Sequence, residues 1–104
     1  MSAKPVKFFF VRKDANETMC FPVDKIRNIT MTDATSLLIS IEPDAGGTDV
    51  GNVDLTITEG KSKDVIKAIM HAGRSSRALF IDLADMETNK YLHADITAVE
   101  STTE

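Results

Sequence analysis

Hydrophobic and polar residues alternate over much of the chain, which predicts a domain built mainly of short β-strands. Successive side chains of a strand point to opposite faces of a sheet, so a half-buried strand is apolar at every second position. The segment 53–58 shows this pattern most cleanly, with Val53, Leu55 and Ile57 separated by polar residues. The same alternation and a β-rich composition predict further strands at 6–12, 18–23, 26–32, 36–42, 78–84 and 91–99.

The first of these strands departs from alternation at Phe8, Phe9 and Phe10, and therefore carries aromatic rings on both faces. A strand that is apolar on both sides is expected to be covered on both sides. The strand that follows it ends near Pro22, which cannot donate a backbone hydrogen bond to a neighbour. We therefore expect the segment 18–23 to lie at a sheet edge.

Residues 61–73 carry the clearest helical period of the chain. Val65, Ile66, Ile69 and Met70 recur at the spacing that places apolar side chains on one face of a helix, and we expect this stripe to be core. A helix of about 12 residues is only about 18 Å long, which is too short to cover both faces of a large sheet. The sheet must then curl around the helix, or a second subunit must cover the remaining apolar surface.

These elements predict an α+β fold in a single domain of 104 residues. We expect a mostly antiparallel, strongly curved sheet or open barrel or roll of about 6–7 strands, five before the helix and two after it, packed on one short helix. If the strand at 53–58, the helix and the strand at 78–84 form a βαβ unit, the two strands are parallel. The polar tail 100–104 is expected to fray.

Several apolar residues have no place in the core that this arrangement predicts. They are Phe8 and Phe10 on the first strand, together with Leu38, Phe80 and Val99. Exposed apolar surface and unpaired strand edges both favour association between copies of a chain. We therefore expect a homo-oligomer.

The composition narrows the class of protein further. The net charge of −4 and a pI near 5.1 argue against a general attraction to nucleic acid or anionic lipid. The single cysteine, Cys20, cannot form an internal disulfide. No apolar stretch approaches the roughly 18 residues of a transmembrane helix, and the run Phe8–Val11 is too short for the core of a signal peptide. We expect a cytoplasmic protein without membrane contact.

Gly60, Lys61 and Ser62 follow a predicted strand and open the helix, as the end of a phosphate-binding loop does. The full motif requires a glycine five residues before Gly60, where this chain has Leu55 inside a strand. Without a glycine-rich loop, backbone N–H groups do not surround a phosphate. We interpret Gly60 as a tight turn and Ser62 as a helix cap.

Histidine, cysteine and carboxylate residues do not match a metal site or a catalytic constellation in their spacing. His71 and His93 are the only histidines, and Cys20 is remote from both in sequence. The segment 43–52, rich in glycine and aspartate, lacks the spacing of a calcium loop and is expected to be a solvated loop able to contact a partner. We expect no cofactor, no metal and no catalytic residue; an acid–base role for His93 with Asp95 is the weakest alternative.

Basic residues are concentrated in and after the helix. Residues 61–77 contain five of the 12 Lys and Arg residues and one acidic residue. At about 100° per residue, Lys63, Lys67 and Arg74 lie along one edge of the helix, and Arg77 follows it. This basic edge is either a solvated rim whose lysine stems cover the core, or a surface for phosphates or an acidic partner.

The layout from Val53 to Val99 begins with Val-Asp-Leu-Thr-Ile-Thr-Glu-Gly-Lys and continues with a short helix and a closing hairpin. In this it resembles small uncharacterised proteins of marine tailed bacteriophages, over about half of the chain. The resemblance implies a virus-encoded structural or host-interaction protein, in the host cytoplasm or the virion. It assigns no functional residue to this sequence.

We therefore expect a small non-enzymatic interaction or assembly protein that self-associates, with Phe8 and Phe10 among its contact residues. The alternative is a binder of nucleic acid or of an acidic partner that uses Lys63, Lys67, Arg74 and Arg77.

Overall fold

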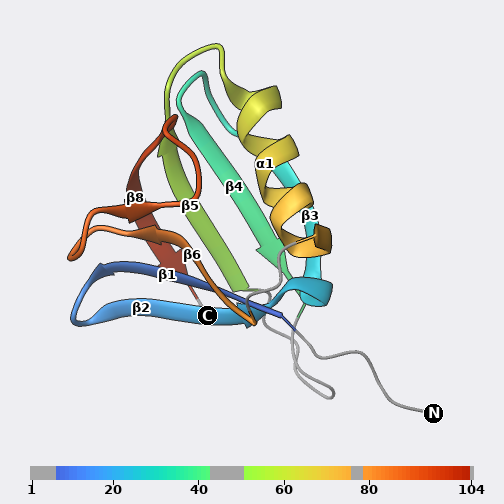
Figure 1. The fold of residues 1–104 in the computed structure, drawn as a ribbon. Coiled ribbons are helices and arrows are strands. Elements are labelled where there is room, and N and C mark those ends of the chain that lie inside the picture. The colour runs from blue at the N-terminus through green and yellow to red at the C-terminus, as the bar shows by residue number, and fades with distance from the viewer. Residues whose placement is uncertain (1–6, 43–50, 76–78, 104) are drawn as a thin grey trace.

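The computed structural model describes residues 7–42, 51–75 and 79–103, and it shows a β-rich α+β domain (Figure 1). The described elements are β1 (Phe8–Asp14), β2 (Glu17–Pro22), the 3-10 turn η1 (Val23–Lys25), β3 (Ile26–Met31), β4 (Ser36–Ile41), β5 (Gly51–Ile57), α1 (Ser62–Ser75), β6 (Phe80–Asp85), β7 (Lys90–Tyr91) and β8 (Ile96–Thr103). The predicted combination of strands with one α-helix is confirmed for this part of the chain.

The strands form two four-stranded sheets, in the orders β2-β1-β6-β7 and β3-β4-β5-β8. All described pairs are antiparallel except β1 with β6, which is parallel. The expected single curved sheet or open barrel is not confirmed. The conditional βαβ unit was wrong, because β5 pairs with β4 and β8, whereas β6 belongs to the other sheet. As expected, β2 is an edge strand that ends at Pro22.

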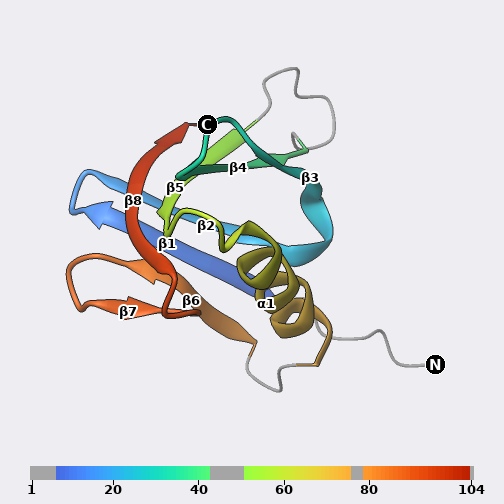
Figure 2. The same ribbon diagram turned by 90° about the horizontal axis from the view of Figure 1, so that it is seen from above.

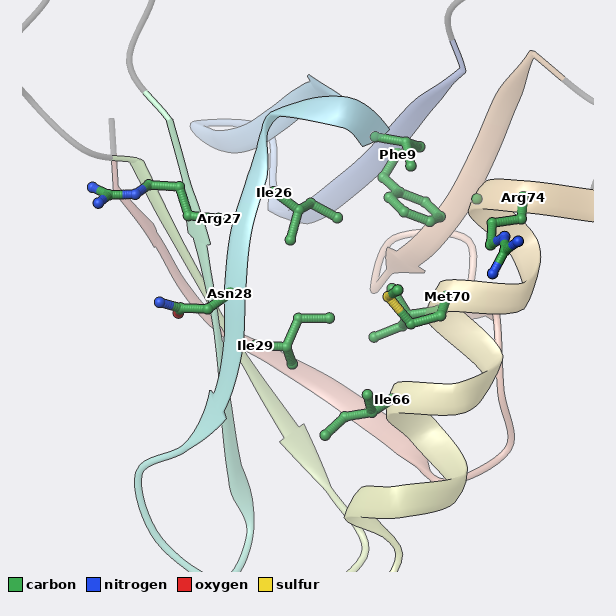
Figure 3. A pocket seen from close by; sticks show the side chains of 11 residues that line it. Phe9, Ile26, Arg27, Asn28, Ile29, Ile66, Met70 and Arg74 are labelled. Carbon is green, nitrogen blue, oxygen red and sulfur yellow. The ribbon is translucent and has the colours of Figure 1, made fainter.

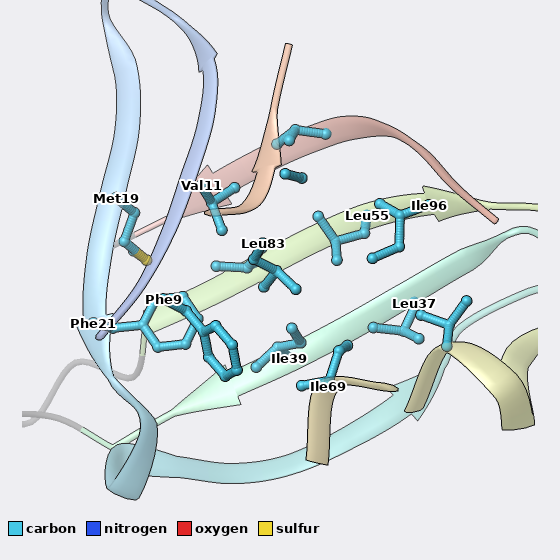
Figure 4. Close-up of a cluster of buried hydrophobic side chains, with 14 of the residues drawn as sticks. Phe9, Val11, Met19, Phe21, Leu37, Ile39, Leu55, Ile69, Leu83 and Ile96 are labelled. Atoms are coloured by element: carbon cyan, nitrogen blue, oxygen red, sulfur yellow. The ribbon is translucent and has the colours of Figure 1, made fainter. Parts of the chain in front are cut away.

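The core lies between the two sheets and α1. Alternate residues of β4 and β5 are fully or almost fully buried, as the sequence pattern predicted. From the other sheet Phe9 and Val11 of β1 point into the same space, and Ile69 of α1 closes it (Figure 4). The rings of Phe9 and Phe21 lie 5.9 Å apart between centroids, in a tilted arrangement. Buried apolar side chains from both sheets and from α1 form one continuous cluster, which holds the two sheets together.

The helix begins at Ser62, and the N–H of Val65 donates to the carbonyl of Lys61. Lys61, not Ser62, therefore occupies the N-cap position, and the predicted cap at Ser62 was wrong. The turn before it matches the prediction, since Gly60 has a φ of 83°, a conformation that glycine adopts without a steric penalty. Val65 and Ile69 are buried, but Met70 is 52% exposed. Met70 was therefore misassigned to the core.

The C-terminal third departs most from the predicted pattern. The expected strand 91–99 is divided into β7, a turn and β8, and β8 continues to Thr103 instead of ending in a frayed tail. Register shifts against β5 flank Thr97 and Glu100 and mark two β-bulges. A bulge inserts one residue into one strand and changes which side chains face the core. Val99 is consequently buried at 2% exposure and is not available as an outer contact.

Strand β8 connects the two sheets. It hydrogen-bonds to β5 in its own sheet and also contacts β1, β6 and β2 of the other sheet. Its bent path is visible from above (Figure 2), and bends of this kind are typical of bulged strands. The two sheets and the helix therefore enclose one core.

Candidate interaction surfaces

The outer face of the β2-β1-β6-β7 sheet carries a cluster of exposed aromatic rings. Register pairs Phe8 with Phe80, and Phe10 lies two residues further along β1 on the same face. The Phe10 and Phe80 rings lie 5.2 Å apart between centroids, a separation typical of interacting aromatic pairs. Phe8 is 37% exposed and Phe80 is 55% exposed. We call Phe8, Phe10 and Phe80 the aromatic face.

The expectation that β1 is covered on both sides holds for only one side among the described residues. Phe9 is buried on the inner side, as expected, but no described element covers Phe8 and Phe80 on the outer side. Cys20 on β2 lies directly opposite Phe10 in the register and is exposed. Leu79, just before β6, is also 53% exposed. Cys20 therefore adjoins the aromatic face, whereas Leu79, as the chain neighbour of Phe80, is expected to point to the opposite side.

An ion pair limits the aromatic face along β1. Arg12 donates two hydrogen bonds to Asp85, from Nε to Oδ1 at 2.8 Å and from its terminal nitrogen to Oδ2 at 2.7 Å. The Arg12 guanidinium also lies 5.3 Å from the centroid of the Phe10 ring, within the range of a cation–π contact. Asp85 accepts further bonds from the Thr88 hydroxyl and the N–H of Glu87. The bond from Arg12, with smaller contributions from these donors, lowers the pKa of Asp85 to about 2.

A groove of about 430 Å³ lies on the other side of the molecule, between α1 and β3. Ile26 and Ile29 of β3 point into it from one wall, Ile66 and Met70 of α1 from the other, and Phe9 lies at its base (Figure 3). Its volume falls within the range of protein sites that bind small ligands or side chains. The groove is thus an apolar recess with one wall made by an edge strand.

The basic edge predicted on the helix is exposed as expected. Lys63, Lys67 and Arg74 are all solvent-accessible residues of α1, whereas Arg77 lies outside the described residues. Only Arg74 of these lines the groove. Arg27 also belongs to the lining, but its side chain points away from the groove in Figure 3. Arg74 is therefore the cationic side chain placed at the groove itself.

Among the described residues, no histidine, cysteine, aspartate or glutamate lines the groove. The N–H of Asp95 donates to Nδ1 of His93 at 3.1 Å, which is a local contact in the turn before β8. His93 and Asp95 do not line the groove, and His71 is exposed on α1. In the ranges that the structure describes, no group of three His, Cys, Asp or Glu residues is arranged to hold a metal ion.

The pKa of a second carboxylate, that of Asp54, is shifted in the opposite direction from the pKa of Asp85. Oδ1 of Asp54 on β5 is buried and has no hydrogen-bond partner among the described residues. Burial, and then the negative charges of Glu100 and Asp33, raise the pKa of Asp54. Glu100 and Asp33 each repel the Asp54 carboxylate.

Sequence reasoning identified Phe8, Phe10 and the basic edge but did not identify the groove. The residues of the groove come from β1, β3 and α1, which are far apart in the chain. One local signal was present: Met70 stands at the flank of the apolar stripe, next to the basic edge. The segment 43–52, considered as a contact loop, lies outside the described residues up to position 50.

Comparison with protein-family models, curated proteins and solved structures finds no match for this chain. Within the described ranges, no helix combines the length and the apolar character that crossing a bilayer requires.

Proposed function

We propose that this protein is a small non-enzymatic interaction or assembly protein that self-associates through its aromatic face. The observation that carries the proposal is the contact between Phe10 and Phe80 on an outer sheet face, where Phe80 remains 55% exposed. Large contiguous apolar patches on soluble proteins commonly mark interaction sites. A second copy presenting the same face provides a complementary apolar surface in a two-fold arrangement.

The geometry of the face favours contact between two copies. A sheet face is broad, and Cys20, which lies opposite Phe10 in the register, is also exposed. The neighbouring edge strand β2 supplies additional contact area. Arg12 and Asp85 neutralise each other beside the face, so this pair adds little repulsion between copies. Aromatic anchors with a polar rim are typical of stable interfaces.

The test is the mass of the wild-type protein and of a Phe80→Ser variant, measured by light scattering across a dilution series. Burying the exposed half of a phenylalanine contributes about 1 kcal/mol. Two copies in a symmetric dimer contribute about 2 kcal/mol, so Phe80→Ser should weaken association roughly thirtyfold. Met70→Ser, at a residue of similar exposure on α1, is the matched control and should leave association unchanged. A wild-type protein that stays monomeric at every concentration refutes self-association.

Cys20 provides an independent measurement because it lies beside Phe10 on the same face. Partial desolvation raises the pKa of the Cys20 thiol, and covering the face should protect the thiol further. We expect the rate of Cys20 alkylation to fall as the protein concentration rises, and this fall to require roughly thirtyfold higher concentrations in Phe80→Ser. Concentration-independent alkylation in a protein that associates would place the interface elsewhere.

The alternative function is binding of nucleic acid or an acidic partner through the basic edge. The exposure of Lys63, Lys67 and Arg74 on one helix supports it, and the net charge of −4 opposes a general attraction to polyanions. A double Lys63→Glu, Lys67→Glu variant should lose binding to single-stranded DNA or polyglutamate at low salt. Absence of wild-type binding at low salt, or full binding by the variant, removes this alternative.

A role as a virus-encoded structural or host-interaction protein is proposed on the resemblance of residues 53–99 alone. Such a role is compatible with an assembly protein that joins copies of itself. Its test is the presence of the chain in purified phage particles, detected by mass spectrometry. A chain found neither in particles nor in infected cells would remove the viral assignment without affecting the self-association proposal.

A further inference from the structure

The groove between α1 and β3 is bordered by a strand edge whose backbone groups are free within the described part of the chain. Strand β3 is the last strand of its sheet and pairs there with β4. The N–H of Thr32 donates to the carbonyl of Ser36 on the β4 side. Because backbone groups of an antiparallel strand point alternately to its two sides, those of Met31 and Ile29 point away from β4. The register against β4 is regular from Asn28 to Met31, so this part of the edge is a template for an added strand. A register shift between Ile26 and Asn28 interrupts the alternation before it.

The apolar walls of the groove match the side chains that such a strand would present. Ile29 of β3 and Ile66 and Met70 of α1 face each other across the groove (Figure 3). A strand added to β3 extends the sheet beneath the helix, and every second side chain then points toward α1. Met70 is 52% exposed, so an incoming apolar side chain would cover it. The groove therefore favours an extended peptide with apolar residues at alternate positions.

Charge selects the partner further. The groove lining contains no acidic residue, although the protein as a whole has a net charge of −4. Arg74 is the cationic side chain at the groove, since that of Arg27 points away from it (Figure 3). Arg74 lies in the last turn of α1 at one end of the groove (Figure 3). A guanidinium binds a carboxylate through two parallel hydrogen bonds. The complementary group on the partner is a carboxylate, from an acidic side chain or from the C-terminus of a peptide.

We propose that the groove binds an extended peptide by β-strand addition to β3, with apolar side chains between β3 and α1 and a carboxylate at Arg74. Main-chain hydrogen bonds provide affinity in this mode, and side-chain pockets provide specificity. An anionic amphiphile such as a fatty acid satisfies the apolar walls and Arg74, but it makes no use of the backbone groups of Ile29 and Met31, which then hydrogen-bond only to water. The free edge is the reason to prefer a peptide.

This site shares no residue with the aromatic face, and among the described residues of the basic edge it shares only Arg74. The aromatic face does not contribute to the groove, and neither Lys63 nor Lys67 lines it. Phe80→Ser should therefore leave peptide binding unchanged, and the double Lys63→Glu, Lys67→Glu variant should reduce it by less than about twofold. Loss of self-association and loss of peptide binding are distinguishable by these variants.

The probe is the best binder from a displayed library of peptides of about nine residues, with Leu, Ile, Val or Phe at alternate positions and a C-terminal Asp. Hydrogen exchange of the wild-type amides, followed by NMR, is the first readout. The N–H groups of Ile29 and Met31 should exchange fast in the free protein and become protected on binding, whereas that of Thr32 is protected in both states. A peptide N-methylated on its strand-pairing nitrogens is the matched control and should bind at least tenfold more weakly.

Variants locate the peptide in the groove. Met70→Ser should weaken binding about fivefold. Arg74→Gln should weaken the acidic peptide about tenfold but change binding of its amidated, Asn-terminated counterpart by less than about twofold. Both residues are exposed, so the variants should keep the wild-type melting temperature.

Either of two binding results would overturn the proposal: the library yields no enriched peptide, or the N-methylated peptide binds as tightly as the unmodified one. It would also be overturned if the amides of Ile29 and Met31 stay unprotected on binding, or if Met70→Ser leaves the affinity for the peptide unchanged. Dodecanoate that binds as tightly as the best peptide and displaces it, without protecting these amides, would assign the groove to an anionic amphiphile instead.

Discussion

Replacing Asp85 with Asn should destabilise the protein at neutral pH, and the effect should disappear in acid. Asp85 is 3% exposed and joins β1 to the β6–β7 hairpin through its two hydrogen bonds with Arg12. Asn has the same size but no charge, and its amide N–H₂ group would face the donors of Arg12. The substitution therefore removes the charge-assisted pair with little change in packing.

The magnitude follows from the lowered pKa of Asp85, about 2 in the folded protein against 3.8 for the free group. At 1.36 kcal/mol per pKa unit the difference gives an upper limit of about 2.5 kcal/mol. The Arg12 side chain is 28% exposed, so solvent screens the pair and we expect about 1–2 kcal/mol. Because the pKa of Asp85 is lower in the folded protein than in the free group, the charged carboxylate stabilises the fold fully at pH values above the free-group pKa of 3.8. This contribution should fall to about half by about pH 3 and vanish below the folded pKa.

The assay is urea unfolding of wild type and Asp85→Asn between about pH 7 and about pH 2.5. The difference in unfolding free energy should shrink steadily across the acidic part of this range. Glu87→Gln is the matched control, because Glu87 is 44% exposed and also contacts Arg12 at 3.3 Å; it should cost less than about 0.5 kcal/mol. A stability difference for Asp85→Asn that is independent of pH would show that the ion pair does not stabilise this fold.

Two further substitutions should change stability in informative directions. Asp54→Asn should raise the melting temperature at neutral pH, because burial and nearby carboxylates raise the pKa of Asp54 and so destabilise its charged form. This gain should be lost below about pH 4, where Asp54 is protonated in the unfolded chain as well. A variant that melts at a lower temperature than the wild type at neutral pH would contradict this explanation. Gly73→Ala should destabilise α1 despite the higher helix propensity of alanine, because its Cβ would lie 2.7 Å from Cγ1 of Val23. In a Val23→Ala background the same change should become stabilising by thermal melts, and an unchanged sign would refute the steric explanation.

The sequence alone located most elements through local periodicity. Alternation placed β4 and β5 and their buried faces, and the helical period placed α1 within a few residues of its bounds. The edge position of β2 followed from Pro22. The exposure of Phe8 and Phe80 followed because the chain has more apolar residues than the predicted core could bury. These features are set by side-chain direction and backbone chemistry within a few residues, so they can be derived without a fold.

Only the tertiary structure determined which strands pair and which side chains are buried in the core. The sequence does not encode in any local pattern that β6 pairs with β1 rather than with β5, because pairing depends on segments far apart in the chain. The bulges of β8 buried Val99 by changing the phase of alternation. The groove likewise exists only because α1 packs beside the free edge of β3 over Phe9. Helical periodicity fixed the side of α1 on which Met70 stands, but only packing decided whether that side was covered.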